Sequence, residues 1–264
     1  MPRSPKSICA LSIGGLDPGG GAGLLADSRA FGAAGVFGAG AASMLTVQSA
    51  SGLKKSVAVA PGLLSEQVRE VMRNQNVRAI KVGALGSAQN VAIVADFLAI
   101  HRDIPSVVDT VMRPTRGRDR LLNESALAAL RTKLLPRATL VTVNGPEASV
   151  LVGKRVANLR EAKEAARILV KKGARAVLVK GGHLTGKHAV DLLVTADDVI
   201  EFMEKRLELP PIHGGGCILA SLIAGRMAHG EDDLEASIRW AKKAHYRALQ
   251  KARDVGGDMS ILLA

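Results

Sequence analysis

Short apolar runs alternate with longer segments of helical hydrophobic spacing along most of the chain. The runs are rich in Val, Ile, Leu and Ala, which is typical of strands buried on both faces. They read "SICALSI", "VFGAGAASMLTV", "SVAVA", "AIKVG", "SVVDTV", "TLVTV" and "AVLVKGG". The segments between them predict helices over 20–34, 65–74, 87–101, 123–133, 146–152 and 158–172. Strands that alternate with helices predict an α/β fold with a largely parallel sheet covered on both faces.

The alternation ends after Gly182. Two further apolar runs, "AVDLLVT" and "VIEFMEKRLEL", flank the turn sequence "ADD" and predict a β-hairpin. Helices are then predicted over 214–229 and 232–254, the second with an aspartate as its N-cap. The Arg- and Gly-rich stretch "RPTRGRDR", 113–120, predicts a mobile loop. Because no linker-like composition or repeat interrupts the pattern, we expect residues 1–264 to form one domain.

The chain carries 36 Lys and Arg against 24 Asp and Glu, a formal charge of +12. The basic residues are spread along the whole chain, and only 2% of all residues are aromatic, which is too few to stack nucleic-acid bases. We therefore expect no nucleic-acid partner. A positive field raises the local concentration of anions, so the charge favours an anionic small ligand.

The two cysteines, Cys9 and Cys217, lie far apart in the sequence, which argues against a disulfide framework. This usage is typical of a reducing compartment, and we expect the protein in the cytoplasm. No apolar run approaches the roughly 20 residues of a membrane span, so we expect no membrane partner. The six histidines show no metal-ligand spacing, which argues against a structural zinc site. His213 is interpreted as a turn residue.

Three glycines run into a predicted helix in "HGGGCILAS", 213–221. Because the helix is almost wholly apolar, the glycines predict bare N-terminal amides that bind a phosphate or a developing oxyanion. The alternative is a turn packed against the sheet. A second cluster, "GGLDPGGGAGLLAD", also precedes a predicted helix, and there a tight turn explains the glycines equally well. "GGHLTGKH" resembles a Walker motif, but His188 replaces the metal-binding hydroxyl and a predicted strand follows, so we reject that interpretation.

Polar residues follow the predicted strands at the ends where ligands bind in open parallel sheets. They are Asp17, Gln48, Asp109, Asn144, Glu147 and Lys180. We expect all of them along one rim of the sheet.

Several stretches, taken in order and spacing, resemble the hydroxymethylpyrimidine/phosphomethylpyrimidine kinases of thiamin synthesis, members of the ribokinase-like superfamily. They are "ALSIGGLDPGGGAGLLAD", "LTVQS", "IKVGAL", "VVDTVM", "LLPRATLVTVNGPEA", "AVLVKGGH" and "HGGGC", and the resemblance covers roughly residues 8–252. It implies a ribokinase-like three-layer α/β/α fold with a mostly parallel central sheet. It also implies ATP- and Mg²⁺-dependent phosphorylation of 4-amino-5-hydroxymethyl-2-methylpyrimidine and then of its monophosphate. We also expect a homodimer.

The resemblance implies roles for individual residues. The pyrimidine pocket would comprise Gly15, Ala22, Asp27, Gln48 and Val111. The ATP side would comprise Asp109, Asn144, Glu147 and Lys180, with Asp109 and Glu147 as Mg²⁺ ligands. The catalytic group would comprise Lys180, Gly214, Gly215, Gly216 and Cys217.

Residue chemistry bears on three of these roles. Gln48 offers both a donor and an acceptor to an aminopyrimidine edge. Asp27 can accept a hydrogen bond from the amino or hydroxymethyl group of the substrate. The alternative is that its carboxylate lies in the first turns of a helix only because the helix dipole stabilises negative charge there. Cys217, at a predicted helix N-terminus, is expected to have a lowered pKa and to take the substrate's proton. The alternative is a small buried hydrophobe.

The chain departs from the family at several site positions. Gly215 stands where the family commonly has Thr, and Thr115 stands where it has Lys. Pro211 and Ile212 replace a polar pair. Ala84 replaces a Met that usually lines the pyrimidine pocket, and the larger pocket keeps pyridoxal or pyridoxine phosphorylation open. Because the loop around Thr115 is altered, a second alternative stays open, namely that the chain is a catalytically weak, pyrimidine-binding regulatory protein.

Overall fold

A nine-stranded sheet forms the middle layer of the computed structural model, which describes residues 7–116, 121–230 and 233–263. The strands lie in the order β3-β2-β1-β4-β5-β6-β7-β8-β9. They are β1 (Ile8–Leu16), β2 (Phe37–Ser49), β3 (Gly52–Ala58), β4 (Asn76–Val82), β5 (Ser106–Asp109), β6 (Leu140–Asn144), β7 (Val177–Lys180), β8 (His188–Val194) and β9 (Val199–Lys205). Neighbours from β2 to β7 are parallel, whereas β3, β8 and β9 pair antiparallel at the edges. The predicted parallel sheet and hairpin are confirmed.

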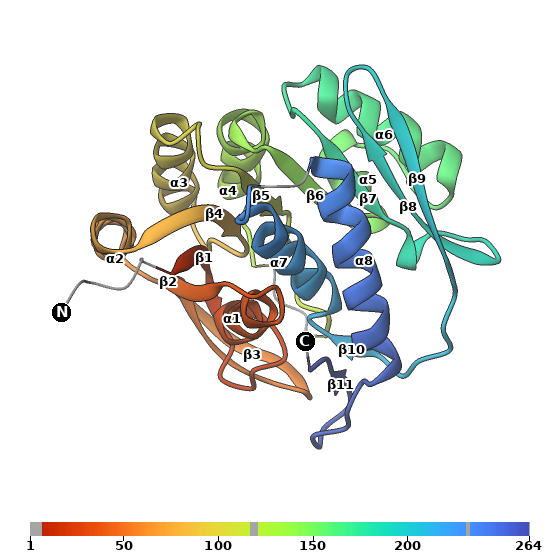
Figure 1. Ribbon diagram of the computed structural model, residues 1–264, viewed down its shortest axis with the longest axis horizontal. Coiled ribbons are helices and arrows are strands. Elements are labelled where there is room, and N and C mark those ends of the chain that lie inside the picture. Colours follow the sequence, from red (N-terminus) through yellow and green to blue (C-terminus); the bar gives the residue numbers. More distant parts are fainter. Residues whose placement is uncertain (1–6, 117–120, 231–232, 264) are drawn as a thin grey trace.

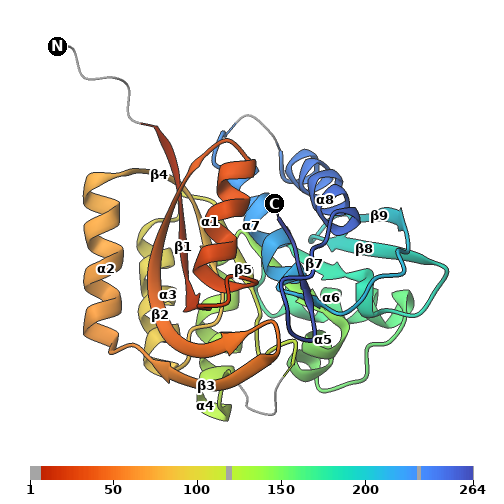
Figure 2. The same cartoon turned by 90° about the horizontal axis from the view of Figure 1, so that it is seen from below.

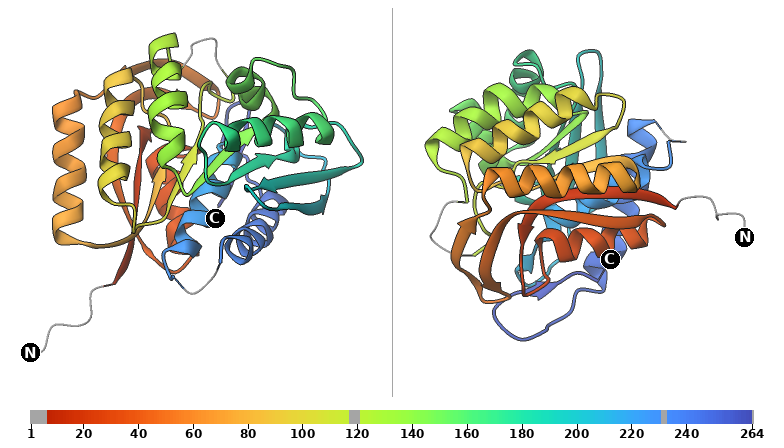
Figure 3. Two further views of the ribbon diagram at one scale, coloured as in Figure 1. Left: turned by 90° about the horizontal axis from the view of Figure 1, so that it is seen from above. Right: turned by 90° about the vertical axis from the view of Figure 1, so that its left-hand side faces the viewer.

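Helices pack on both faces of this sheet. They are α1 (Gly23–Ala33), α2 (Pro61–Asn74), α3 (Ala88–Ile100), α4 (Glu124–Ala129), α5 (Gly145–Val152), α6 (Leu159–Lys171), α7 (Gly215–Met227) and α8 (Leu234–Gln250). Helices α2 to α6 share one apolar core with the sheet, and α1, α7 and α8 share a second core on the opposite face (Figure 1). Figure 3 shows the two helix layers with the sheet between them. The predicted three-layer α/β/α architecture is confirmed.

Several predicted helices differ in their bounds, among them α2, which begins at Pro61 instead of residue 65, and α8, which ends at Gln250 instead of residue 254. Helix α1 begins at Gly23 instead of residue 20, because Gly20 has a φ of 71° and belongs to the preceding turn. The segment predicted as one helix over 123–133 is α4 followed by a π-helical turn (Leu130–Leu134) and a 3-10 turn (Leu135–Arg137). Pro136 lacks an N–H and disfavours α-helix at the residue before it, so the regular helix does not continue.

The parallel register places the ends of the central strands side by side. Asp109 of β5 lies opposite Thr142 of β6, and Asn144 of β6 lies opposite Lys180 of β7. Figure 2 shows the long strand β2 curving away toward its C-terminal end, where β3 pairs with it. The predicted rim of polar residues therefore exists from β5 to β7.

A second, two-stranded sheet joins distant parts of the chain. In it β10 (Ile212–His213) pairs in parallel with β11 (Ser260–Ile261), and Ser260 N donates to Pro211 O at 2.9 Å (Figure 1). No local pattern predicts this pairing. It places His213 directly before α7.

Two predicted features fall partly on residues that are not described. Residues 117–120 of the predicted mobile loop and residue 232 at the start of the last predicted helix lie outside the described residues. Helix α8 has Asp233 as its N-cap, and this confirms the aspartate cap. No helix in the three described ranges is long and apolar enough to cross a membrane.

Candidate active site

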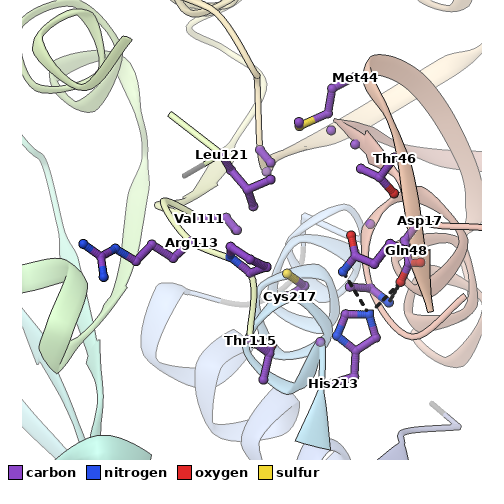
Figure 4. A pocket seen from close by; sticks show the side chains of 18 of the residues that line it. Asp17, Met44, Thr46, Gln48, Val111, Arg113, Thr115, Leu121, His213 and Cys217 are labelled. Atoms are coloured by element: carbon purple, nitrogen blue, oxygen red, sulfur yellow. Dashed lines mark hydrogen bonds and ion pairs between the residues drawn. The ribbon is translucent and has the colours of Figure 1, made fainter. Parts of the chain in front are cut away.

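A cavity opens where β1, β2 and β4 end, next to the first turn of α7 (Figure 4). Four of the predicted substrate residues line it, namely Gly15, Ala22, Gln48 and Val111. Gly214 and Cys217 line the same cavity. The fold thus brings four of the predicted substrate residues and two members of the predicted catalytic group to one place.

Two of the departures from the family also lie in this wall. Ala84 and Thr115 both line the cavity, as does Met44 of β2. Met44 is buried in a small apolar cluster with Leu53 and Leu121, against which Ala84 packs. A methionine side chain therefore remains in the wall, although it comes from β2 and not from the segment after β4 that holds Ala84.

Asp27 does not line this cavity, and this corrects the prediction that its carboxylate contacts the substrate. Its side chain is fully buried, and Lys81 Nζ donates to Oδ1 and Oδ2 at 2.9 and 2.8 Å. The hydroxyls of Ser12 and Ser221 donate to the same carboxylate at 2.6 and 2.7 Å. The direction in which α1 packs decides this outcome, because it turns Asp27 toward the sheet and α7.

Lys81, which reaches the cavity wall above Asp27, is a site residue that sequence reasoning missed. It is 1% exposed. Burial lowers the pKa of a lysine, but the carboxylate of Asp27 outweighs it and holds the pKa of Lys81 above its ordinary value. A lysine inside the apolar run "AIKVG" is the signal that could have found this pair.

His213 is also a cavity residue instead of the turn residue that was predicted. Its Nε2 lies 2.7 Å from Asp17 Oδ2 and 3.2 Å from the side-chain amide of Gln48 (Figure 4). Asp17 and His213 are 3% and 2% exposed. Burial raises the pKa of Asp17, but hydrogen bonds from His213 and from two backbone amides outweigh it, so the pKa lies below its ordinary value.

A close approach to backbone requires glycine at the N-cap of α7, and Lys180 lies near a glycine in the first turn of that helix. Gly214 has a φ of 76°, and a Cβ there would lie 2.0 Å from the carbonyl oxygen of Gly21. At Gly216 a Cβ would lie 3.0 Å from Lys180 Nζ. The first turn of α7 therefore has bare amides beside a lysine ammonium, an arrangement suited to a phosphoryl group.

Lys180 and Asp109 form an ion pair at the rim of the sheet. Lys180 Nζ donates to Asp109 Oδ1 at 2.6 Å, and Thr142 Oγ1 donates to the same oxygen at 2.8 Å. Despite burial, Asp109 and Glu147 raise the pKa of Lys180, and Lys180 lowers that of Asp109. Both groups are therefore charged at neutral pH.

Glu147 and Asn144 form a capping box at the start of α5. Asn144 Oδ1 accepts from Glu147 N at 2.8 Å, and Glu147 Oε2 accepts from Asn144 N at 3.0 Å and from Thr110 Oγ1 at 3.2 Å. Burial raises the pKa of Glu147 to about 7, with Asp109 adding to the rise while Lys180 opposes it. The rim thus holds two carboxyl groups beside one lysine.

The thiol of Cys217 does not have the lowered pKa that its helix position predicted. Burial, with the Asp109 carboxylate, raises the pKa of Cys217 to about 12, although Lys81 and Lys180 oppose the rise. Desolvation of a thiolate at this site outweighs the favourable field of the helix N-terminus. The prediction was wrong because it counted only the helix field.

Comparisons with known proteins identify relatives of this chain. The phosphomethylpyrimidine kinase family model matches residues 17–261. A hydroxymethylpyrimidine/phosphomethylpyrimidine kinase of Rhizobium meliloti is 39% identical over 246 residues, 93% of this chain and 91% of its own. The phosphomethylpyrimidine kinase of Clostridium difficile has a TM-score of 0.80 at 29% identity, covering 91% of this chain and 99% of that one.

A pyridoxal kinase of Bacillus subtilis, solved as an ADP complex, has a TM-score of 0.90 at 26% identity and covers 97% of both chains. The fold is therefore that of the ribokinase-like kinases, as the sequence predicted. On the family match and the identity over nearly its full length, the chain belongs to the phosphomethylpyrimidine kinase family.

Proposed function

We propose that this protein is a kinase that uses ATP to phosphorylate 4-amino-5-hydroxymethyl-2-methylpyrimidine and then its monophosphate, as the names of its relatives suggest. One observation carries the proposal. Gly214 and Cys217 belong to the wall of the cavity that contains Gln48. The same two residues belong to the N-terminus of α7, where the bare amides lie. A hydroxymethyl group on a heterocycle in the cavity therefore lies beside an anion-binding helix N-terminus.

In this proposal the protein contributes position and charge. ATP supplies the phosphoryl group, and the transition state of its transfer carries negative charge over the equatorial oxygens. The amides of Gly214, Gly215, Gly216 and Cys217, together with the ammonium of Lys180, face that charge. Cys217 is a protonated thiol at neutral pH, so its backbone amide is the part that acts. A base contributes little until late in such a transition state.

Asp109 and Glu147 are the residues we propose for Mg²⁺. A buried carboxyl group, that of Asp109, and a half-buried one, that of Glu147, lie beside Lys180, which balances only one of them, so a divalent cation fits the remaining charge. Among the described residues, no group of three His, Cys, Asp or Glu side chains forms a ready-made metal site. This suits Mg²⁺, which keeps several waters and is bound through one or two carboxylates plus phosphates.

Glu147→Gln is expected to raise the Mg²⁺ concentration that gives half-maximal activity by about tenfold. The wild-type enzyme should also lose apparent Mg²⁺ affinity below about pH 7, where Glu147 becomes protonated, and the variant should lack that step. Both points are tested by measuring activity as a function of Mg²⁺ concentration at several pH values between roughly 5.5 and 8.5, a range that brackets the pKa of Glu147. An unchanged Mg²⁺ dependence would leave Glu147 as a helix cap only.

Pyridoxal phosphorylation is the second candidate, favoured by Ala84 in the cavity wall and by the likeness to the Bacillus subtilis enzyme. ADP release should be measured with the pyrimidine, its monophosphate, pyridoxal, pyridoxine and no acceptor. We expect the highest kcat/KM with the pyrimidine. Equal or better use of pyridoxal would overturn the assignment, and calorimetric pyrimidine binding without ADP release would indicate a regulatory binding protein.

We further propose a single-domain cytoplasmic homodimer without a nucleic-acid or membrane partner. The free state of Cys9 and Cys217 supports a reducing compartment. Leu45, Val47 and Val57 on β2 and β3 are 50%, 54% and 56% exposed, and an apolar sheet surface of this kind suits a second copy of the chain. Sedimentation at several protein concentrations measures the oligomeric state.

A further inference from the structure

The back wall of the cavity contains a chain of three polar side chains, Asp17, His213 and Gln48. Resting on the proposed function, we infer that Asp17 and His213 orient the side-chain amide of Gln48 so that its N–H group, not its carbonyl, faces the cavity. The pocket then selects a heterocycle that presents a ring nitrogen as a hydrogen-bond acceptor. Asp17 and His213 are positioning residues, and Gln48 is the group that contacts the ligand.

The first step is the state of Asp17, whose partners are donors. Its Oδ1 accepts from Gly19 N at 2.9 Å, and its Oδ2 accepts from Ala22 N at 3.0 Å. Backbone amides can only donate, so this cradle favours the ionised carboxylate. A carboxylate can only accept, so the 2.7 Å contact requires a proton on His213 Nε2.

The second step is the orientation of the histidine ring, which packing holds in place. A Cβ on Gly21 would lie 2.2 Å from His213 Cδ2 and 3.0 Å from Ile261 Cγ2, so the ring lies close against the Gly21 backbone. His213 Nδ1 is buried and has no hydrogen-bond partner among the described residues. Of the two neutral tautomers, the one with its proton on Nε2 fits the site, because a proton on Nδ1 would be buried without an acceptor.

The third step is the amide of Gln48. If the amide nitrogen of Gln48 is the atom that lies 3.2 Å from His213 Nε2, the N–H group of the amide faces the N–H group of the ring, and neither can accept a hydrogen bond. A turn of the amide by 180° exchanges its oxygen and nitrogen and lets Oε1 share the Nε2 proton with Asp17. Figure 4 shows one arm of the amide toward His213 and the other toward the cavity. The arm in the cavity is therefore the NH₂ group.

The tautomer is tested directly by ¹⁵N NMR of the histidine side chains in the unliganded protein. We expect His213 to show a protonated Nε2. A protonated Nδ1 with an unprotonated Nε2 would overturn the inference. Because no substrate is used, this result does not depend on the proposed function. If the wild type phosphorylates none of the acceptors, the function fails while the tautomer remains measurable.

The donor role of Gln48 is tested with Gln48→Glu, which keeps the shape but removes the N–H group. We expect about a tenfold higher KM for the pyrimidine with a smaller change in kcat. An analogue with CH in place of the ring nitrogen beside the amino-bearing carbon should lose this sensitivity to Gln48→Glu. If Gln48 instead accepts from the amino group, glutamate binds as well or better, and such an unchanged or lower KM would overturn the inference.

The positioning role of Asp17 is tested by coupling. Asp17→Asn should raise the KM in the wild-type background and have no further effect on it in the Gln48→Glu background, because Asp17 acts through Gln48. Asp96→Asn, an exposed aspartate on α3, is the matched control. Additive effects of Asp17→Asn and Gln48→Glu on KM would show that Asp17 acts on the fold and not on the amide.

Discussion

Replacing Lys81 with methionine is expected to lower the free energy of unfolding by about 3–5 kcal/mol. The variant leaves the Asp27 carboxylate fully buried without its cation, since Lys81 Nζ is the group that donates to both oxygens. The hydroxyls of Ser12 and Ser221 remain, but they do not carry a balancing charge. Urea unfolding followed by circular dichroism measures the loss.

Two further variants separate the charge from the packing. Lys54→Met, at an exposed lysine of β3, should change the unfolding free energy by less than about 0.5 kcal/mol. Adding Asp27→Asn to Lys81→Met removes the unpaired charge and should restore a large part of the loss. If Lys81→Met costs under about 1 kcal/mol, the pair is not the buried ion pair that the geometry indicates.

Lys180→Met is expected to lower kcat by about 10²–10³-fold, the usual effect of removing one group that stabilises transition-state charge. Lys180 Nζ lies beside Gly216 in the first turn of α7, where the phosphoryl group is proposed to bind. Asp109 also loses its cation in this variant, so some stability is lost as well. Steady-state kinetics must therefore be measured well below the melting temperature of the variant.

Lys187→Met is the matched control, because Lys187 is an exposed lysine of the segment that follows Lys180. It should retain the wild-type kcat. A Lys180→Met enzyme whose kcat stays within about threefold of wild type would place Lys180 outside the reacting site, since such a change is under 1 kcal/mol in activation free energy.

The residues at the rim could be predicted because one rule places them. Parallel strands bring their carboxyl ends to one edge, so Asp109 and Lys180 could be placed together without knowing any side-chain contact. Asp27 shows where that reasoning stops. Its position in α1 was evident, but whether it faces the cavity or the interior depends on how α1 packs against α7 and the sheet.

His213 and Cys217 illustrate two other limits. The place of His213 in the cavity wall depends on pairing between β10 and β11, which lie far apart in the sequence and are each too short to give a periodic signal. For Cys217 the sequence located the helix N-terminus correctly, but the pKa depends on a competition between helix field and desolvation. Only the packed structure shows that desolvation is the larger effect.

The pairing of β10 with β11 also sets when the cavity can be completed during synthesis. Every strand of the main sheet precedes His213 in the chain, whereas Ile261, which packs with His213 around Gly21, comes much later. A nascent chain that stops before residue 261 therefore holds His213 without the strand behind it. A ligand that needs this wall therefore binds only to chains that already contain β11, so it stabilises these and gives no help to a growing chain that is shorter.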